Sequence, residues 1–196
     1  DGIAGKDGKD NRGSGTDKQY RAFVGKSTEK TVEIRTVAVP ASGSSAFAEQ
    51  ADTVLGGSGN PIDPVSFALS SGRDRLWVMH GGDVDMQLRL YPNPLSGGDR
   101  APSFSYTADD MGALWLDETH DRLYTCAYHR IMSWAGASTM NASRAPDTVL
   151  DTAGAGYGRD ITSISGDPLA DQLFAVHSAY PDEQVVLLSE AKATRQ

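Results

Sequence analysis

Short apolar runs, each bounded by Gly, Pro, Asn or Asp, follow one another along the chain from about residue 20. Runs of this length between turn-forming residues are typical of antiparallel strands joined by tight turns. No stretch of the sequence keeps a helical spacing of apolar residues between capping signals. The pattern therefore predicts an all-β chain. The expected strands lie at residues 21–24, 31–39, 53–55, 65–69, 76–80, 86–91, 104–107, 113–116, 123–128, 130–134, 148–150, 161–165, 173–177 and 185–188.

Three of these strands follow the same marker, an Asp with Arg or Gln after it, then Leu and an aromatic residue. The marker occupies residues 74–77, 121–124 and 171–174. A second marker, Arg-Ala-Pro, runs in phase at residues 100–102 and 144–146, and the sequence of residues 52–55 returns unchanged at residues 147–150. The spacing of about 48 residues lies within the range of propeller blades, which have four strands each.

The strand after each marker is apolar without alternation, as in residues 76–79 and 173–176. A strand with one wet face should alternate, so an unbroken apolar run indicates that both faces are covered. Stacking of each blade between two neighbours covers both faces in this way. We expect Leu76, Leu123 and Leu173 to occupy equivalent buried positions on second strands. We expect the marker aspartates to form tight turns, because Asp can bond its own backbone.

The most complete unit runs from Asp117 to Leu150 and joins an apolar strand, the marker, a short hairpin, Arg130-Ile131 before Trp134, and the Arg-Ala-Pro segment. This unit resembles the NHL-type and YVTN-type propeller repeats of bacterial secreted and surface proteins. The resemblance extends in weaker copies over residues 20–196. It implies a β-propeller of four-stranded antiparallel blades, with about 3.5 to 4 blades in this chain. Such propellers include scaffolds, adhesins, ligand binders and a few enzymes, so no single reaction is implied.

The repeat divides the chain into a flexible Gly-rich tether at residues 1–19 and blades at approximately residues 20–60, 61–108, 109–153 and 154–196. The first blade lacks a clear innermost strand, and the last ends after three strands. Unpaired strand edges recruit partners. We therefore expect the arc to be completed by further sequence, by a second copy or by another protein. The expected contact, by self-association or with a protein partner, is the strand Val185, Val186, Leu187 and Leu188.

The net charge of −8 and the scattered distribution of 18 basic residues oppose binding to a phosphate backbone, so nucleic acid is not an expected partner. No apolar run reaches the length of a membrane-spanning helix, so no transmembrane segment is expected. Similar Gly-rich tethers follow the lipid-modified Cys of bacterial surface lipoproteins, which leaves lipid anchoring upstream of residue 1 open. We expect an extracellular or bacterial cell-surface location.

The sequence offers few residues in patterns that would indicate catalysis or the binding of a metal ion or cofactor. His80 and His177 lie at equivalent repeat positions, but two blades apart they are too distant to share a metal ion. The Gly-rich turn at residues 81–85 offers too few oxygen donors for calcium, and residues 154–158 lack the Lys-Ser or Lys-Thr pair of a phosphate loop. Cys126 lies in an apolar strand and is expected to be a buried free thiol. The sequence therefore assigns no catalytic, cofactor-binding or metal-ligating residue, and no cofactor.

Three functions remain open at this point. The favoured one is a non-catalytic extracellular or surface scaffold that binds a protein or another ligand. The second is part of a propeller hydrolase or lactonase-like enzyme, which should gather polar residues at the mouths of the innermost strands. The expected innermost strands offer mostly Ser, Thr and apolar residues, with Asp117 and Asp160 at their ends. The third is a repeating subunit of an extracellular assembly, in which open blade faces meet head to tail.

Overall fold

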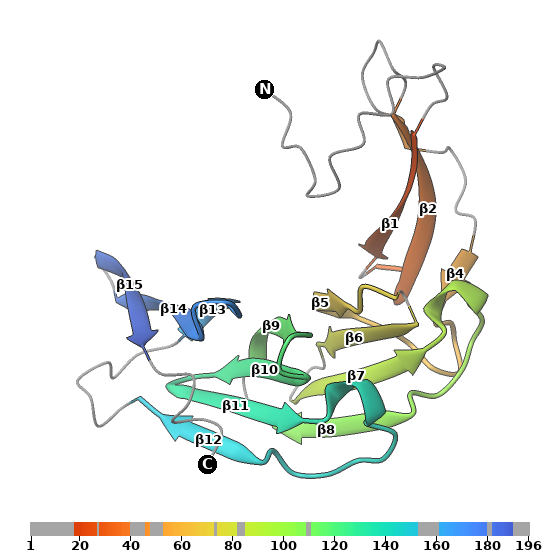
Figure 1. The fold of residues 1–196 in the computed structure, drawn as a ribbon. Coiled ribbons are helices and arrows are strands. Elements are labelled where there is room, and N and C mark those ends of the chain that lie inside the picture. The colour runs from red at the N-terminus through yellow and green to blue at the C-terminus, as the bar shows by residue number, and fades with distance from the viewer. Residues whose placement is uncertain are drawn as a thin grey trace.

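The computed structural model describes residues 18–26, 28–39, 46–47, 53–72, 74–81, 85–108, 111–152, 161–179 and 182–189. These residues form strands β1 to β15 and two short 3-10 turns, η1 and η2. The strands make four antiparallel sheets that follow one another along an arc (Figure 1). The all-β prediction is confirmed.

The second and third sheets are complete four-stranded meanders in sequence order. Each places a 3-10 turn directly after its third strand, η1 at Pro94–Ser96 and η2 at Ala137–Thr139. The second sheet contains β5 (Pro64–Leu69), β6 (Arg75–His80), β7 (Met86–Pro92) and β8 (Phe104–Ala108). The third contains β9 (Met111–Asp117), β10 (Arg122–Ala127), β11 (Arg130–Ala135) and β12 (Thr148–Asp151).

The first strands of neighbouring sheets lie against one another. Strand β9 contacts β5 on one side and β13 (Ile161–Asp167) on the other, so these three strands line the inside of the arc. Four-strand meanders repeated around a common centre, with their first strands innermost, are the blades of a β-propeller. The predicted fold class is therefore confirmed, as are the expected innermost strands at residues 65–69, 113–116 and 161–165.

The first sheet contains β1 (Lys18–Lys26), β2 (Thr31–Val39), β3 (Ala46–Phe47) and β4 (Thr53–Leu55). Its register identifies β1 as a second strand. Strand β4 pairs with β2 through Leu55 and Val32, as β12 pairs with β11 through Leu150 and Ile131. The hairpin between β1 and β2 also accepts a hydrogen bond from Ile62, which opens the next blade, as the β10–β11 hairpin does from Ile161. No described residue fills the innermost position of this blade.

This register reveals a fourth copy of the marker that the sequence alone did not show. Arg21, Ala22 and Phe23 align with Arg122, Leu123 and Tyr124, because Ala22 pairs with Arg35 as Leu123 pairs with Trp134. Alanine replaces the leucine, and Tyr20 stands where the other copies have Asp. Lys18 and Gln19 belong to β1, so the predicted tether at residues 1–19 lies outside the described residues except at these two positions.

The fourth sheet contains β13, β14 (Gln172–Ala179) and β15 (Asp182–Ser189) in that order. Among the described residues, β15 pairs only with β14. The predicted contact strand, Val185 to Leu188, is therefore the third strand of this blade. Whether a partner binds there is untested by this structure and stays a prediction.

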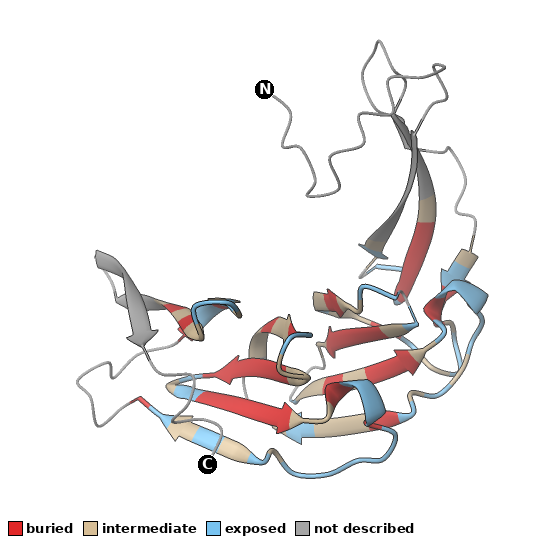
Figure 2. Cartoon of the chain, viewed as in Figure 1, coloured by how far each residue is buried: buried red, intermediate tan, exposed pale blue. Residues whose placement is uncertain are grey.

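The core consists of the contacts between blades. Along β10, Leu123 and Ala127 pack on the second blade, whereas Tyr124 and Cys126 pack on the fourth. Leu76, Leu123 and Leu173 each face the preceding blade and are 0, 0 and 1% exposed. The buried residues are concentrated in the middle strands of the second and third sheets (Figure 2). The expectation that unbroken apolar strands are covered on both faces is confirmed for residues 76–79. At residues 173–176 only Leu173 and Ala175 are buried, and Phe174 and Val176 are half-buried.

The aspartates at the strand turns have structural roles, as predicted. Asp121 and Asp171 adopt left-handed backbone angles, with φ of 52° and 54°. Four residues before each of these, a further carboxylate caps the turn. Oδ1 of Asp117 accepts the His120 N–H at 3.0 Å, and Oδ1 of Asp167 accepts the Leu169 N–H at 2.9 Å. Asp tolerates such angles because its short polar side chain bonds locally.

Replacing Leu123 by Ala should lower the free energy of unfolding by about 2 to 5 kcal/mol, because the side chain is fully buried between two blades. Urea unfolding followed by tryptophan fluorescence measures this loss. The matched control is Leu169→Ala, at a turn position that is 87% exposed. The control should change stability by less than about 0.5 kcal/mol. Equal urea midpoints for the two variants would contradict the blade assignment.

Candidate functional site

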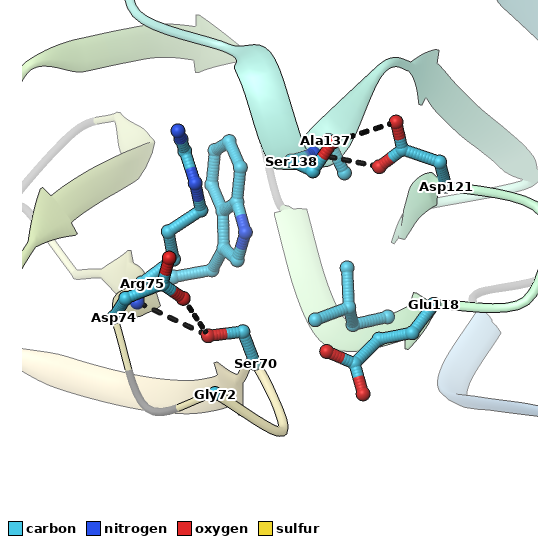
Figure 3. Close-up of a pocket in the computed structure, with 10 residues that line it drawn as sticks. Ser70, Gly72, Asp74, Arg75, Glu118, Asp121, Ala137 and Ser138 are labelled. Atoms are coloured by element: carbon cyan, nitrogen blue, oxygen red, sulfur yellow. Dashed lines mark hydrogen bonds between the residues drawn. The ribbon is translucent and has the colours of Figure 1, made fainter.

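A cavity of about 330 Å³ lies between the second and third blades, at the end where their first and second strands are joined. Its walls come from the β5–β6 hairpin, the β9–β10 turn and η2 (Figure 3). The volume falls at the lower end of the range of small-molecule sites. The lining residues are Ser70, Gly72, Asp74, Arg75, Trp77, Leu116, Glu118, Asp121, Ala137 and Ser138.

The wall of the second blade is fixed by the side chain of Ser70. Its hydroxyl donates to Oδ1 of Asp74 at 2.7 Å and accepts the Arg75 N–H at 3.1 Å. The hydrogen bond from Ser70 is the largest influence on Asp74 and lowers the pKa of its carboxyl group. Asp74 therefore keeps its negative charge at neutral pH.

The wall of the third blade is fixed by Asp121. Its two carboxylate oxygens accept the Ser138 N–H at 2.6 Å and the Ser138 hydroxyl at 2.8 Å, as the dashed lines in Figure 3 show. The backbone carbonyl of Asp121 also accepts the Ala137 N–H at 3.1 Å. These bonds hold η2 against the turn before β10.

Two hydrogen bonds cross from one blade to the other at this cavity. Oε1 of Glu118 accepts the Ser71 N–H at 2.7 Å, and the Arg75 guanidinium donates to the Met140 carbonyl at 2.9 Å. Trp77, fully buried, and Leu116 supply apolar lining on the two sides. The cavity therefore has walls fixed to one another across the blade interface.

Acidic residues outnumber basic ones at this cavity. Asp74, Glu118 and Asp121 contribute three carboxylates, and Arg75 contributes one guanidinium that is already bonded to the third blade. An acidic rim over a partly apolar wall can bind a group with a positive charge at the end of an apolar stem. Lysine and arginine side chains have this composition.

The histidines singled out from the sequence lie elsewhere. His80 pairs with Pro64 and His177 with Ile161, and the register of each pair is shifted at the same place, so the two positions are equivalent as predicted. Nδ1 of His80 accepts the Asp63 N–H at 2.8 Å. Nδ1 of His120 lies 2.7 Å from Oδ2 of Asp117, within the turn between β9 and β10. The side chain of His177 is outside the described residues.

Of the other features singled out from the sequence, the structure describes Cys126, which lies in β10. Residues 82–84 of the Gly-rich turn lie outside the described residues, and Cys126 is a buried free thiol as predicted. Burial raises the pKa of this thiol. Residues 154–158 and Asp160 lie outside the described residues. Within the part of the chain that the structure describes, no group of three or more His, Cys, Asp or Glu could hold a metal ion, and no helix is long and apolar enough to cross a membrane.

The cavity itself was missed by sequence reasoning. The marker residues Asp74, Arg75 and Asp121 were recognised as turn residues, but Glu118 and Ser138 belong to no motif. The repeat spacing could have indicated that the marker turns of neighbouring blades lie side by side. It could not indicate which side chains form hydrogen bonds from one blade to the next.

No protein-family model and no curated protein matches this sequence. Among solved structures, the chain is similar to a protein from Lactobacillus plantarum, with a TM-score of 0.54, 14% identity, and coverage of 88% of this chain and 54% of that one. It is also similar to a luciferin-regenerating enzyme, with a TM-score of 0.44, 10% identity, and coverage of 82% and 54%. A eukaryotic initiation factor gives a TM-score of 0.49, 10% identity, and coverage of 88% and 50%. The chain thus spans about half the length of these proteins, and the likeness to the Lactobacillus plantarum protein concerns the fold alone.

Burial is the largest of the effects that lower the pKa of His80 to about 4. In the unfolded chain a histidine titrates near 6.5. Between these values the unfolded chain binds a proton that the folded chain does not, so stability should fall as the pH drops from about 6.5 to about 4. His80→Gln should show a smaller fall in thermal midpoint over this range. Circular dichroism melts measure it, with His129→Gln, at a half-buried hairpin position, as the control. Parallel pH curves for the parent chain and His80→Gln would show that this prediction is wrong.

Proposed function

We propose that this chain is a non-catalytic propeller scaffold that binds a protein partner, and that the cavity between the second and third blades receives a basic side chain of that partner. The observation that carries the proposal is the composition of the cavity, with three carboxylates and one guanidinium around a partly apolar wall. A Lys or Arg side chain places its charge at the rim and its methylene stem along Trp77 and Leu116.

The bonding of the carboxylates favours binding over acid–base chemistry. A general base works best with a pKa near neutral pH, whereas the Ser70 hydroxyl lowers the pKa of Asp74. Asp121 and Glu118 each accept a backbone N–H, so their positions are fixed before a ligand arrives. Fixed acceptors reduce the ordering entropy of binding and give affinity without moving parts.

The location outside the cell is part of the same proposal. It rests on the resemblance of the repeat markers to bacterial secreted and surface propellers and on the Gly-rich segment at residues 1–19. In this proposal the segment tethers the blades to a surface, and lipid anchoring upstream of residue 1 is one means of attachment. A flexible polar tether lets a propeller present its face to a partner over a range of orientations.

The alternative of a hydrolase has one observation in its favour, the pair of Asp117 and His120 at the end of an innermost strand. A carboxylate that orients a histidine is a common general-base arrangement. However, Asp117 also caps its turn through the His120 N–H, and Asp167 caps the equivalent turn with Ala170 in the place of the histidine. The pair is thus explained by the turn, and the binding function is favoured.

Titration with N-acetyl-lysine amide and N-acetyl-arginine amide tests the proposed site. Binding should shift the Trp77 indole N–H and the amides of Gly72 and Ser138 in NMR spectra, whereas N-acetyl-glutamate amide should not. Glu118→Gln keeps an acceptor for the Ser71 N–H but removes a charge. It should weaken binding by about 1.4- to fivefold, because an exposed ion pair contributes about 0.2 to 1 kcal/mol.

The control for this titration is Glu29→Gln, an exposed charge change on the first blade that should leave the affinity unchanged. Shifts at the cavity of equal size for the lysine and glutamate amides would contradict charge selection. Shifts confined to residues outside the cavity would place the binding site elsewhere.

A further inference from the structure

The opposite charges in the cavity between the second and third blades are not paired with one another. Asp74, Glu118 and Asp121 carry carboxylates and Arg75 carries a guanidinium. In the part of the chain that the structure describes, no ion pair joins Arg75 to any of these carboxylates. Figure 3 shows the guanidinium of Arg75 directed away from the carboxylate of Asp74, with Glu118 on the other side of the cavity. The cavity therefore presents positive and negative groups at separate places.

Most of the hydrogen-bonding capacity of Arg75 is unused. A guanidinium has five N–H donors in a fixed planar arrangement. Among the described residues, that of Arg75 donates only to the Met140 carbonyl, at 2.9 Å. Arg75 is half-buried and lines the cavity, so a group that enters the cavity can reach its remaining donors. Two parallel N–H donors bind a carboxylate strongly and with a defined geometry.

The carboxylates differ in the acceptors that they leave open. Both oxygens of Asp121 accept hydrogen bonds from Ser138. Asp74 and Glu118 each use one oxygen, which accepts from the Ser70 hydroxyl and the Ser71 N–H respectively. Among the described residues, the second oxygen of each has no partner, and both side chains belong to exposed residues. Asp74 and Glu118 are therefore the acceptors available to a cation.

The course of Arg75 follows from one difference between the second and third blades. Arg122, its equivalent in the third blade, donates to the Ser133 hydroxyl of its own blade at 3.1 Å. The register places Leu90 at the corresponding position of the second blade. Leucine accepts no hydrogen bond, so Arg75 extends across the interface to Met140. The sequence of the second blade thus leaves a guanidinium at the cavity.

We propose that the cavity binds a basic residue with a free α-carboxylate, as at the carboxyl terminus of a protein that ends in Lys or Arg. This inference rests on the proposed binding of a basic side chain at the same cavity, and it adds the group that binds Arg75. The α-carboxylate of the ligand binds the Arg75 guanidinium, and its side-chain cation binds Asp74 and Glu118. A volume of about 330 Å³ suits a single residue, because it falls at the lower end of small-molecule sites.

The overall charge of the protein favours the opposite selectivity. The chain has a net charge of −8, and three carboxylates line this cavity. Both repel a ligand that carries a carboxylate of its own. Without a contact to Arg75, a basic residue capped as an amide would bind more tightly than the same residue with a free carboxylate. A preference for the free carboxylate is therefore diagnostic of the contact to Arg75.

NMR titration with N-acetyl-arginine and N-acetyl-arginine amide tests this preference. The free acid should bind about three- to tenfold more tightly, because its carboxylate forms charge-assisted hydrogen bonds with a half-buried guanidinium. The Nε–H signal of Arg75 should shift with the acid and not with the amide. Arg75→Gln should reduce the ratio of the two affinities to one or below. The matched control is Arg122→Gln, which removes the equivalent guanidinium of the third blade and should leave the ratio unchanged.

The outcomes separate this inference from the proposed function. If both ligands shift the cavity signals and the acid binds no more tightly than the amide, the contact to Arg75 is refuted while the binding of a basic side chain stands. If neither ligand shifts these signals, the proposed function itself is wrong. Should Arg75→Gln fail to fold by circular dichroism, the affinity ratio and the Arg75 Nε–H signal of the parent chain decide the question.

Free arginine distinguishes a chain terminus from a free amino acid. Its α-ammonium group lies beside the carboxylate and would repel the Arg75 guanidinium. Free arginine should therefore bind less tightly than N-acetyl-arginine in the same titration. Tighter binding of free arginine would overturn the assignment to a chain terminus.

Discussion

The fold depends on one constraint, that the second strands β6 and β10 are apolar on both faces and each needs a neighbouring blade on both sides. Strand β10 satisfies this by burying Leu123 against the second blade and Tyr124 against the fourth. A sheet packed on one side only would leave half of these side chains in water, at a cost of roughly 25 cal/mol for each Å² of apolar surface. Blades in this chain are therefore stable as members of a stack. Contacts within a single sheet are insufficient.

The turns follow from the stacking. Adjacent blades lie against one another mainly through their first strands, and the turns at the ends of these strands leave a space between the second and third blades. In this chain Asp121 and Ser70 hold those turns by hydrogen bonds within their own blades, and Glu118 and Arg75 bridge the gap. The residues that close the turns thus also line the cavity. The residues that line the cavity keep the hydrogen bonds that hold the turns, so the proposed binding requires no rearrangement of them.

Much of the fold could be predicted from the sequence because strand positions and repeat phase are local properties. The expected strand at residues 86–91 is β7 at Met86–Pro92, and the buried leucines were identified from the marker alone. The copy at Arg21 to Phe23 was missed because Ala22 and Tyr20 replace the leucine and aspartate that define it. The cavity was missed for a different reason. Glu118 and Ser71 are 47 residues apart, and their contact depends on the rotation between blades, which no local pattern specifies.

The two ends of the arc differ in a way that the repeat itself explains. Every blade has a face toward the blade before it and a face toward the blade after it, and the register assigns each residue to one of them. At the first blade the preceding side carries Arg35 and Glu33 in an ion pair, whereas at the fourth blade the following side carries Phe174 and Val176. The two end faces of the described arc therefore differ in polarity, with charged groups on β2 at one end and half-buried apolar side chains on β14 at the other.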